Sequence, residues 1–383
     1  MTGSVTLLRP SADLAWLRLR IRVKSGTTAQ RLVAARLLRA AVPELPVDGL
    51  PLHTRLTTLG ALLTVSADGH GIAVYVTVVP ERLAAATDLI RAALQTPPPA
   101  ELARAAADEV VAVWEWMSAD SESAADLIAD LALHTAPPSW PELYQEMAQA
   151  MSAVSPSFPG LGPATATLVS PFVPDPAVER AIAGLTEGAH AVVATAEEPV
   201  ATTPATLRLD VASEASALVR LGWRTPPRTH PDFPSLAVAA RILGGHYRSL
   251  LMRTFRQERG WSYSPWAMLR SGPERGLWQV SVRVPADRVD EATARVRELV
   301  TGCRPTPAEC AVAVAHTVAE HRTLWSSGES RLTLSGYWQD LGLQPEAERR
   351  DWPRRVGEVS ADRLHGVMRT HLSRPPDLTM ILT

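Results

Sequence analysis

One stretch of the sequence occurs twice, and this repeat constrains the possible folds more than any other feature. Residues 78–91 and 283–297 align, with one inserted residue, over the end of a strand, a turn that contains proline and an amphipathic helix. In each copy a Pro-Ala-Glu triplet follows, at 99–101 and 307–309, and opens a long Ala-rich helix. The strands alternate in hydropathy, and their apolar faces consist of Ile72, Val74, Val76 and Val78 and of Trp278, Val280, Val282 and Val284. The repeat predicts a duplicated α+β fold, with mixed sheets and helices packed on one face of each sheet.

The length of 383 residues also favours two domains, because domains usually contain roughly 100–200 residues. Between the two copies, the segment from Thr195 to Thr206 is rich in Ala, Thr, Pro and Glu, a composition typical of a linker. We therefore expect an N-terminal α+β domain over 1–194, a linker over 195–206 and a C-terminal α+β domain over 207–383.

Composition excludes several classes of protein. The net charge of -2 argues against a partner bound by overall charge, such as nucleic acid or an anionic membrane. No apolar run approaches the roughly 20 residues that span a bilayer, and the N-terminus lacks the pattern of a signal peptide. Two cysteines, Cys303 and Cys310, exclude a disulfide scaffold, and their spacing matches no common zinc or redox motif. We expect a cytoplasmic protein.

An early strand carries a basic face. Arg18, Arg20 and Arg22 alternate with apolar residues, and Lys24 continues the basic series. Two interpretations stay open. The favoured one is a solvated outer surface, and the other is a positive wall of a substrate cavity that prefers acidic peptides.

A glycine pair and an Arg/Tyr pair mark the second half of the chain. Gly244 and Gly245 suit a helix C-terminus that needs a left-handed residue and a close approach of the backbone. Arg256 lies on the following helix, Gly260 ends that helix and Tyr263 begins a strand. The arginine and the tyrosine are seven residues apart across the helix end, so both side chains can point to one site. The alternative is a surface arginine beside a half-buried tyrosine.

Residues 218–300 resemble the C-terminal half of a pitrilysin/insulinase-type metallopeptidase subunit, an inverted zincin similar to the mitochondrial processing peptidase and of the short, two-domain bacterial type. The resemblance rests on the Leu-Gly-Gly turn at 243–245, the Ser-x-Leu at 249–251 and the segment from Arg256 to Tyr263. It implies two homologous halves that form one half of a clam-like chamber. It also implies that Arg256 and Tyr263 contact the substrate near the scissile carbonyl, beside a zinc ion held by another domain.

The zinc-binding helix of this family carries His-x-x-Glu-His, and a later helix supplies a glutamate. In the equivalent helix, residues 29–38, the resemblance aligns Arg31, Ala34 and Ala35 with the His, Glu and His positions, while Glu115 falls near the third ligand. Arginine stays protonated and alanine offers no donor atom, so we expect no metal in this chain.

A second histidine pair, His316 and His321, does not replace this site. The two residues are five apart, and five helical steps turn the second roughly 140° from the first, so they do not share a face. We interpret them as part of a solvated helix face. For His246, in the glycine turn, a structural role is favoured over an approach to substrate.

These observations favour a non-catalytic subunit of a heterodimeric zinc metallopeptidase that processes peptides. Its expected partner is a homologous subunit that carries the zinc, and its contribution is the Arg256–Tyr263 pair, with the glycine turn and the basic strand as substrate-binding wall. The alternative is a metal-free structural or peptide-binding subunit. A third hypothesis is a hydrolase that acts through an unrecognised site.

Overall fold

The protein divides into two compact units, each built from more than one segment of the chain. The computed structural model describes residues 5–8, 13–23, 27–68, 71–96, 98–134, 140–154, 161–172, 174–186, 205–209, 216–272 and 274–383. Unit 1 comprises Met1–Glu115, Gln145–Ala196 and Thr323–Pro345, and unit 2 comprises Trp116–Tyr144, Glu197–Arg322 and Glu346–Thr383. Of the predicted linker, residues 195–204 lie outside the described residues, as does Lys24, while residues 205 and 206 begin strand β8.

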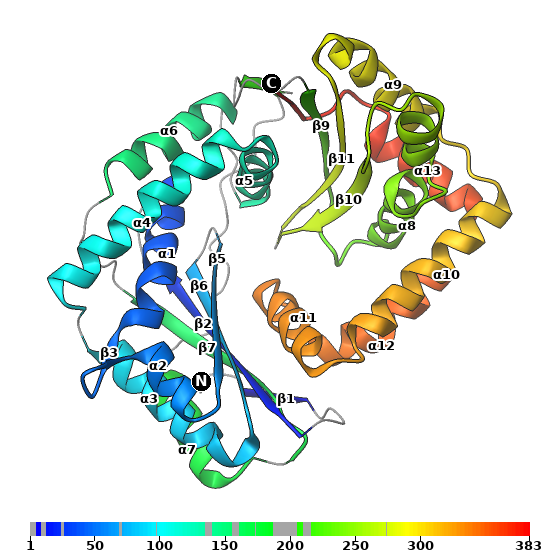
Figure 1. Cartoon of the computed structure of the whole chain (residues 1–383). Helices are drawn as coiled ribbons and strands as arrows, with labels where there is room; N and C mark the ends of the chain where they lie inside the picture. Colours follow the sequence, from blue (N-terminus) through cyan, green and yellow to red (C-terminus); the bar gives the residue numbers. More distant parts are fainter. Residues whose placement is uncertain are drawn as a thin grey trace. The chain divides into compact units, whose positions relative to one another are not determined.

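Unit 1 is built on a five-stranded mixed sheet (Figure 1) with the strand order β1-β7-β2-β6-β5. The strands are β1 (Val5–Leu8), β7 (Leu161–Val169), β2 (Ala15–Val23), β6 (Gly71–Val78) and β5 (Leu62–Asp68). Strands β1 and β7 are parallel, and the other neighbours are antiparallel. A hydrophobic core joins one face of the sheet to α1 (Thr28–Ala41), α2 (Leu52–Thr58), α3 (Leu83–Gln95) and α7 (Pro176–Thr186).

Unit 2 has the same strand arrangement, with β10, β11, β9, β12 and β8 in the places of β5, β6, β2, β7 and β1. Its sheet has the order β10-β11-β9-β12-β8, and β12 is parallel to β8 while the other pairs are antiparallel. The strands are β10 (Trp266–Ser271), β11 (Gly276–Pro285), β9 (Ser216–Thr225), β12 (Leu378–Leu382) and β8 (Ala205–Leu209). One face packs on α8 (Phe233–Gly244), α9 (Val289–Gly302) and α13 (Ala361–Leu372). The apolar faces predicted for the repeated strands are confirmed, because all eight side chains are exposed by 1% or less.

The remaining helices connect and cover these layers. They are α4 (Ala100–Ala119), α5 (Ser121–His134), α6 (Trp140–Ser152), α10 (Pro307–Leu324), α11 (Gly328–Asp340) and α12 (Pro345–Gly357). A short hairpin pairs β3 (Pro46–Val47) with β4 (Leu50–Pro51). Helices α4 and α10 start at the Pro-Ala-Glu triplets, as predicted. Within the described residues, no helix has the length and apolar character needed to span a bilayer.

The prediction that helices cover only one face of each sheet is wrong. In unit 1, α11 packs on the second face of the sheet, where Trp325, Leu332 and Trp338 meet Trp16 and Val169. In unit 2, α5 packs on β9, β11 and β12. Helix α11 comes from the second half of the sequence and α5 from the first, so each half supplies a covering helix to the unit built mainly by the other.

The basic face of β2 lies under this second cover, so the expectation of a solvated surface is wrong as well. Arg18 and Arg20 are each 3% exposed. Arg18 forms an ion pair with Asp340 of α11, and Arg20 pairs with Asp68 at 2.6 Å. Burial is the largest single influence and lowers the pKa of Arg18, but the charges of Asp340 and Tyr75 and the hydrogen bonds to both residues together outweigh it, so the net shift is upward. The pKa of half-buried Arg22 is lowered, first by burial and then by the charge of Arg20. Arg18 and Arg20 are therefore engaged inside unit 1, whereas a contact of half-buried Arg22 with substrate stays a prediction.

Unit 2 contains the corresponding arrangement. Arg220 of β9 is fully buried, and its guanidinium meets Glu122 at 2.5 Å and Asp126 at 2.6 Å, both on α5. In the strand register, Arg220 lies opposite Ser281 of β11, which stands between Val280 and Val282. Arg18 lies opposite Tyr75 of β6, which stands between Val74 and Val76, the equivalent valines of the first copy. The two arginines therefore occupy the same place in the repeat, and each meets carboxylates from the covering helix.

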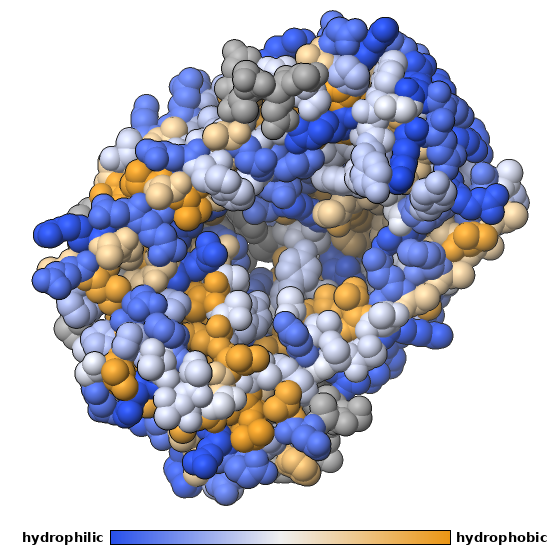
Figure 2. Space-filling view, in the orientation of Figure 1, coloured by the Kyte–Doolittle hydropathy of each residue, from blue (hydrophilic) through white to orange (hydrophobic). Residues whose placement is uncertain are grey.

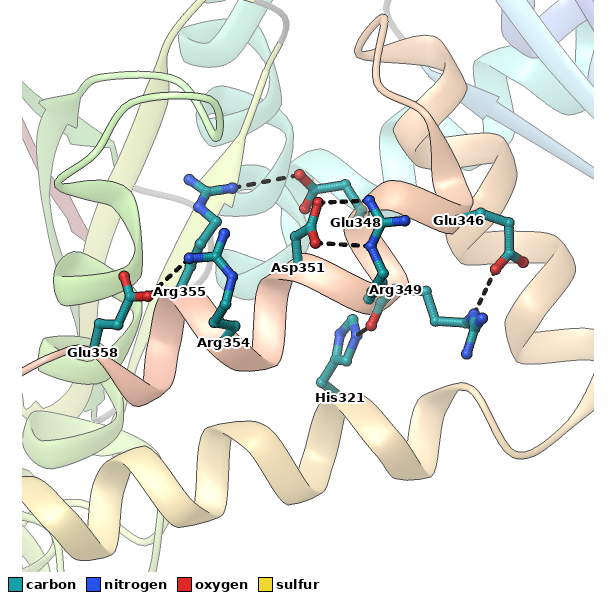
Figure 3. Close-up of polar contacts among 9 residues, drawn as sticks. His321, Glu346, Glu348, Arg349, Asp351, Arg354, Arg355 and Glu358 are labelled. Atoms are coloured by element: carbon teal, nitrogen blue, oxygen red, sulfur yellow. Dashed lines mark hydrogen bonds and ion pairs between the residues drawn. The ribbon is translucent and has the colours of Figure 1, made fainter.

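Helices α10 and α12 pack through a histidine that the sequence analysis assigned to a solvated face (Figure 3). His321 is 6% exposed, and its Nε2 donates a hydrogen bond of 3.2 Å to the carbonyl oxygen of Arg349, whereas His316 is exposed. The solvated interpretation is therefore wrong for His321. Burial lowers the pKa of His321, and the hydrogen bond to the Arg349 carbonyl only partly offsets this. Charged side chains along α12 pair with one another, as Arg349 does with Glu346 at 2.6 Å.

We predict that Glu122→Gln combined with Asp126→Asn lowers the free energy of unfolding by about 3–5 kcal/mol, because the buried charge of Arg220 loses its partners. Adding Arg220→Met should restore most of that loss, since a methionine of similar length needs no carboxylate. Urea unfolding of the three proteins measures both steps. Asp130→Asn is the control, because it removes a partner of the more exposed Arg270 and should cost under about 1 kcal/mol. A further loss on adding Arg220→Met would contradict the assignment.

The second prediction concerns acid stability. Because the folded pKa of His321 is below its ordinary value, the unfolded chain binds the extra proton once the pH falls below about 6.5. The free energy of unfolding of the natural protein should therefore fall more between about pH 7.5 and about pH 5.5 than that of His321→Gln. Urea unfolding at both pH values tests this, and equal losses in the two proteins would refute it.

Candidate functional site

The glycine pair at the end of α8 brings this helix against β10. A Cβ on Gly244 would lie 2.0 Å from the backbone nitrogen of Ala267, and one on Gly245 would lie 2.7 Å from the Cα of Arg241. The expected close approach of the backbone is therefore present. The expected left-handed residue is not, because Gly245 has φ -90° and ψ -3°. Close packing, rather than backbone handedness, is the reason for glycine here.

The segment after the turn forms a π-helix, which spans Met252–Glu258. This wider helix is rare, and single turns of it are frequent at functional sites. The carbonyl oxygen of Phe255 accepts hydrogen bonds from Trp261 at 2.8 Å and from Ser262 at 3.1 Å, and Gly260 turns the chain with φ +64°. The helix thus ends at the predicted glycine. The following strand begins at Trp266 rather than at Tyr263, which lies in the bend before it.

The π-helix and the bend bring Arg256 and Tyr263 together. The Cζ atom of Arg256 lies 4.2 Å from the centroid of the Tyr263 ring. Tyr263 is 77% exposed, so it is not the half-buried tyrosine of the alternative interpretation, while Arg256 is partly buried. Cation–π contact at this distance holds the guanidinium over the ring. Their role toward a substrate stays a prediction.

A second tyrosine, which the sequence analysis did not single out, also contacts Arg256. Tyr247 is 64% exposed, and its ring centroid lies 5.6 Å from the Arg256 Cζ atom. The only sequence signal was an aromatic residue two positions after the glycine pair. Arg256 makes no hydrogen bond or ion pair with any of the described residues, whereas Arg253 pairs with Glu258 and Arg259 with Glu291.

His246 stands at the start of this turn. Its Nδ1 accepts a hydrogen bond of 3.1 Å from the backbone N–H of Arg248, and its ring centroid lies 6.3 Å from that of His316. Burial lowers the pKa of His246, and the nearby charges of His316, Arg241 and Arg248 lower it further. The ring is held in the neutral form by these surroundings.

The positions aligned with the family's metal ligands lie on α1 and α4. Arg31 donates a hydrogen bond of 2.9 Å to Thr28, Ala34 is half-buried, Ala35 is fully buried and Glu115 is exposed. Arginine and alanine supply no ligand atom for zinc. Across the part of the chain that the structure describes, no three or more His, Cys, Asp or Glu side chains form a group that could hold a metal ion.

The two cysteines belong to the core of unit 2. Cys303 and Cys310 are free thiols, exposed by 4% and 2%. Burial raises the pKa of Cys303 to about 11, and burial also raises that of Cys310. Because the thiolate is the reactive form, these groups are unsuited to nucleophilic chemistry in the folded state.

Comparison with known protein families finds a match in the second half of the chain. Residues 177–302 match the family model described as the peptidase M16 inactive domain. No curated protein sequence matches the chain.

Solved structures share the fold across nearly the whole chain. The peptidase M16 inactive domain from Pseudomonas fluorescens is 16% identical, with a TM-score of 0.80 over 99% of this chain and 94% of that one. A protease from Helicobacter pylori is 11% identical, with a TM-score of 0.79 over 100% and 97%. A chain of complex III2 from Candida albicans, with Inz-5 bound, is 13% identical, with a TM-score of 0.75 over 99% and 92%. The α+β fold of these proteins is therefore the fold of this chain, and the resemblance found in the sequence is confirmed by the match of residues 177–302 to the model of the peptidase M16 inactive domain.

Proposed function

We propose that the protein is the non-catalytic subunit of a heterodimeric zinc metallopeptidase that processes peptides. A homologous partner would carry the zinc and the His-x-x-Glu-His helix, and this chain would supply Arg256 and Tyr263. The observation that carries the proposal is the contact between partly buried Arg256 and exposed Tyr263, in a chain whose α1 has Arg31, Ala34 and Ala35 at the aligned ligand positions.

The chemistry of the pair suits peptide cleavage in a shared site. A guanidinium and a phenol can each donate a hydrogen bond to the oxygen of the scissile carbonyl as negative charge develops on it. Stacking on the Tyr263 ring covers a face of the guanidinium but leaves its N–H groups, which lie in the guanidinium plane, directed outward. Arg256 has no carboxylate partner among the described residues, so its charge is available to a ligand.

An extended peptide also needs a partner for its backbone. Strand β5 is an edge strand of the unit 1 sheet, and β10 is an edge strand of the unit 2 sheet. An exposed edge can add a peptide as a further strand through main-chain hydrogen bonds. Leu62, the first residue of β5, is 72% exposed, and Figure 2 shows apolar residues gathered over this part of unit 1. These features support binding of an extended, partly apolar peptide.

The two sheets support a duplicated origin of the fold. They have the same strand order and the same strand directions, and each central strand carries a buried arginine at the same place in the repeat. We infer that the two halves are homologous, as the sequence repeat predicts. In the proposed heterodimer they would form one half of a clam-like chamber and the partner the other.

A second candidate function is a metal-free structural or peptide-binding subunit. The similarity to a chain of complex III2 from Candida albicans favours it, because that protein is part of a large assembly. The two functions differ in what Arg256 and Tyr263 do: in a purely structural subunit their replacement would alter stability alone.

The subunit composition of the native complex tests the main proposal. We expect purification of the protein from its source cell to recover a second subunit of similar size with a His-x-x-Glu-His motif, and metal analysis to find one zinc per pair of subunits. Recovery of an assembly without such a subunit would favour the structural alternative.

The contribution of the pair is tested in that complex with an internally quenched peptide. Arg256→Ala should lower kcat by about 10²–10³-fold, the loss that follows removal of one donor to a developing oxyanion, and Tyr263→Phe should lower it in the same direction. Arg259→Lys is the matched control, since Arg259 also stacks on an aromatic ring, that of Trp261, but pairs with Glu291. Unchanged kcat in both site variants would contradict the role.

A further inference from the structure

We propose that Tyr247 is a third member of the Arg256–Tyr263 site and acts as a positioning residue, which holds the Arg256 guanidinium in the orientation that the substrate requires. This inference rests on the proposed function and extends it to a residue outside the family motif that the sequence analysis used.

The position of Tyr247 is fixed by its surroundings. Gly245 packs on Arg241 and accepts a hydrogen bond of 3.2 Å from it. On the other side of Tyr247, the backbone N–H of Ser249 donates to the His246 carbonyl oxygen at 2.9 Å, and that of Arg248 donates to the His246 ring. The tyrosine therefore projects from a turn that is tied down at both ends.

The exposure of Tyr247 is not explained by packing. Its side chain is 64% exposed, and Tyr263 beside the same guanidinium is 77% exposed. Grouped, exposed aromatic residues are typical of surfaces that bind a ligand or a partner, and tyrosine is among the residues enriched there. Both rings face Arg256, which has no acidic partner among the described residues, whereas Arg253 and Arg259 each pair with a glutamate.

Contact with two aromatic rings restricts the rotamers of the Arg256 side chain more than contact with a single ring does. An arginine side chain has many rotamers, and fixing it only as negative charge develops on the carbonyl oxygen costs conformational entropy in the transition state. Contact with rings from two separate segments, the turn after α8 and the bend before β10, limits that freedom beforehand. Neither ring uses the in-plane N–H groups, so the donors stay available for the carbonyl oxygen. Preorganisation of this kind raises kcat rather than affinity.

The test uses the native heterodimer with an internally quenched peptide, and the full-length subunit for spectroscopy. Tyr247→Leu should lower kcat on the order of tenfold to a hundredfold with little change in KM, whereas Tyr247→Phe, which keeps the ring, should retain the natural rate. With ¹⁵N-arginine labelling, the Arg256 side-chain resonance, assigned by its loss in Arg256→Lys, should shift in Tyr247→Leu but not in Tyr247→Phe.

The outcomes separate the two proposals. If Arg256→Ala lowers kcat while Tyr247→Leu leaves both kcat and the Arg256 resonance unchanged, the positioning role is refuted and the proposed function stands. If Arg256→Ala also leaves kcat unchanged, the proposed function fails and the role of Tyr247 toward substrate fails with it. Tyr247→Gln serves as a second variant if the leucine lowers the thermal midpoint.

Discussion

Each sheet of this protein depends on a buried arginine in its central strand. Arg18 and Arg220 have almost no contact with water, and an unpaired guanidinium at such a site would cost several kcal/mol. Asp340 of α11 compensates the first, and Glu122 and Asp126 of α5 compensate the second. These ion pairs join each sheet to the helix that covers its second face, and each of these helices comes from the half of the chain that mainly builds the other unit.

Local pattern predicted much of the fold. Alternating apolar residues, proline turns and the Pro-Ala-Glu triplets identified the repeated strands and helices, because such signals act over a few residues. The helices that cover the second face of each sheet, α11 and α5, were not predictable from such local signals. Asp340 is 322 residues from Arg18 in the sequence, and no local pattern indicates that these two side chains form an ion pair. Arg18 and Arg20 therefore looked like a solvated face, and His321 looked exposed for the same reason.

The candidate site, like the fold, was predictable from the sequence only in part. The seven-residue spacing of Arg256 and Tyr263, together with the family motif, indicated that the two side chains lie together, and they do. Tyr247 precedes Arg256 by a turn and a helical segment, and nothing in the sequence states where a π-helix will direct its side chains. The glycine pair was predicted correctly, but one of the two reasons was wrong. Glycine is required because α8 packs closely against β10, and not because the backbone is left-handed.

The exchange of α5 and α11 also has a consequence for synthesis on the ribosome. Residues 15–23 leave the ribosome long before the carboxylate that neutralises Arg18, because Asp340 lies 322 residues further along the chain. The second face of the N-terminal sheet, which carries Arg18 and Trp16, stays without its covering helix until α11 has been synthesised. Such a delay prolongs exposure of apolar surface and of strand edges, the conditions under which nascent chains aggregate or recruit chaperones.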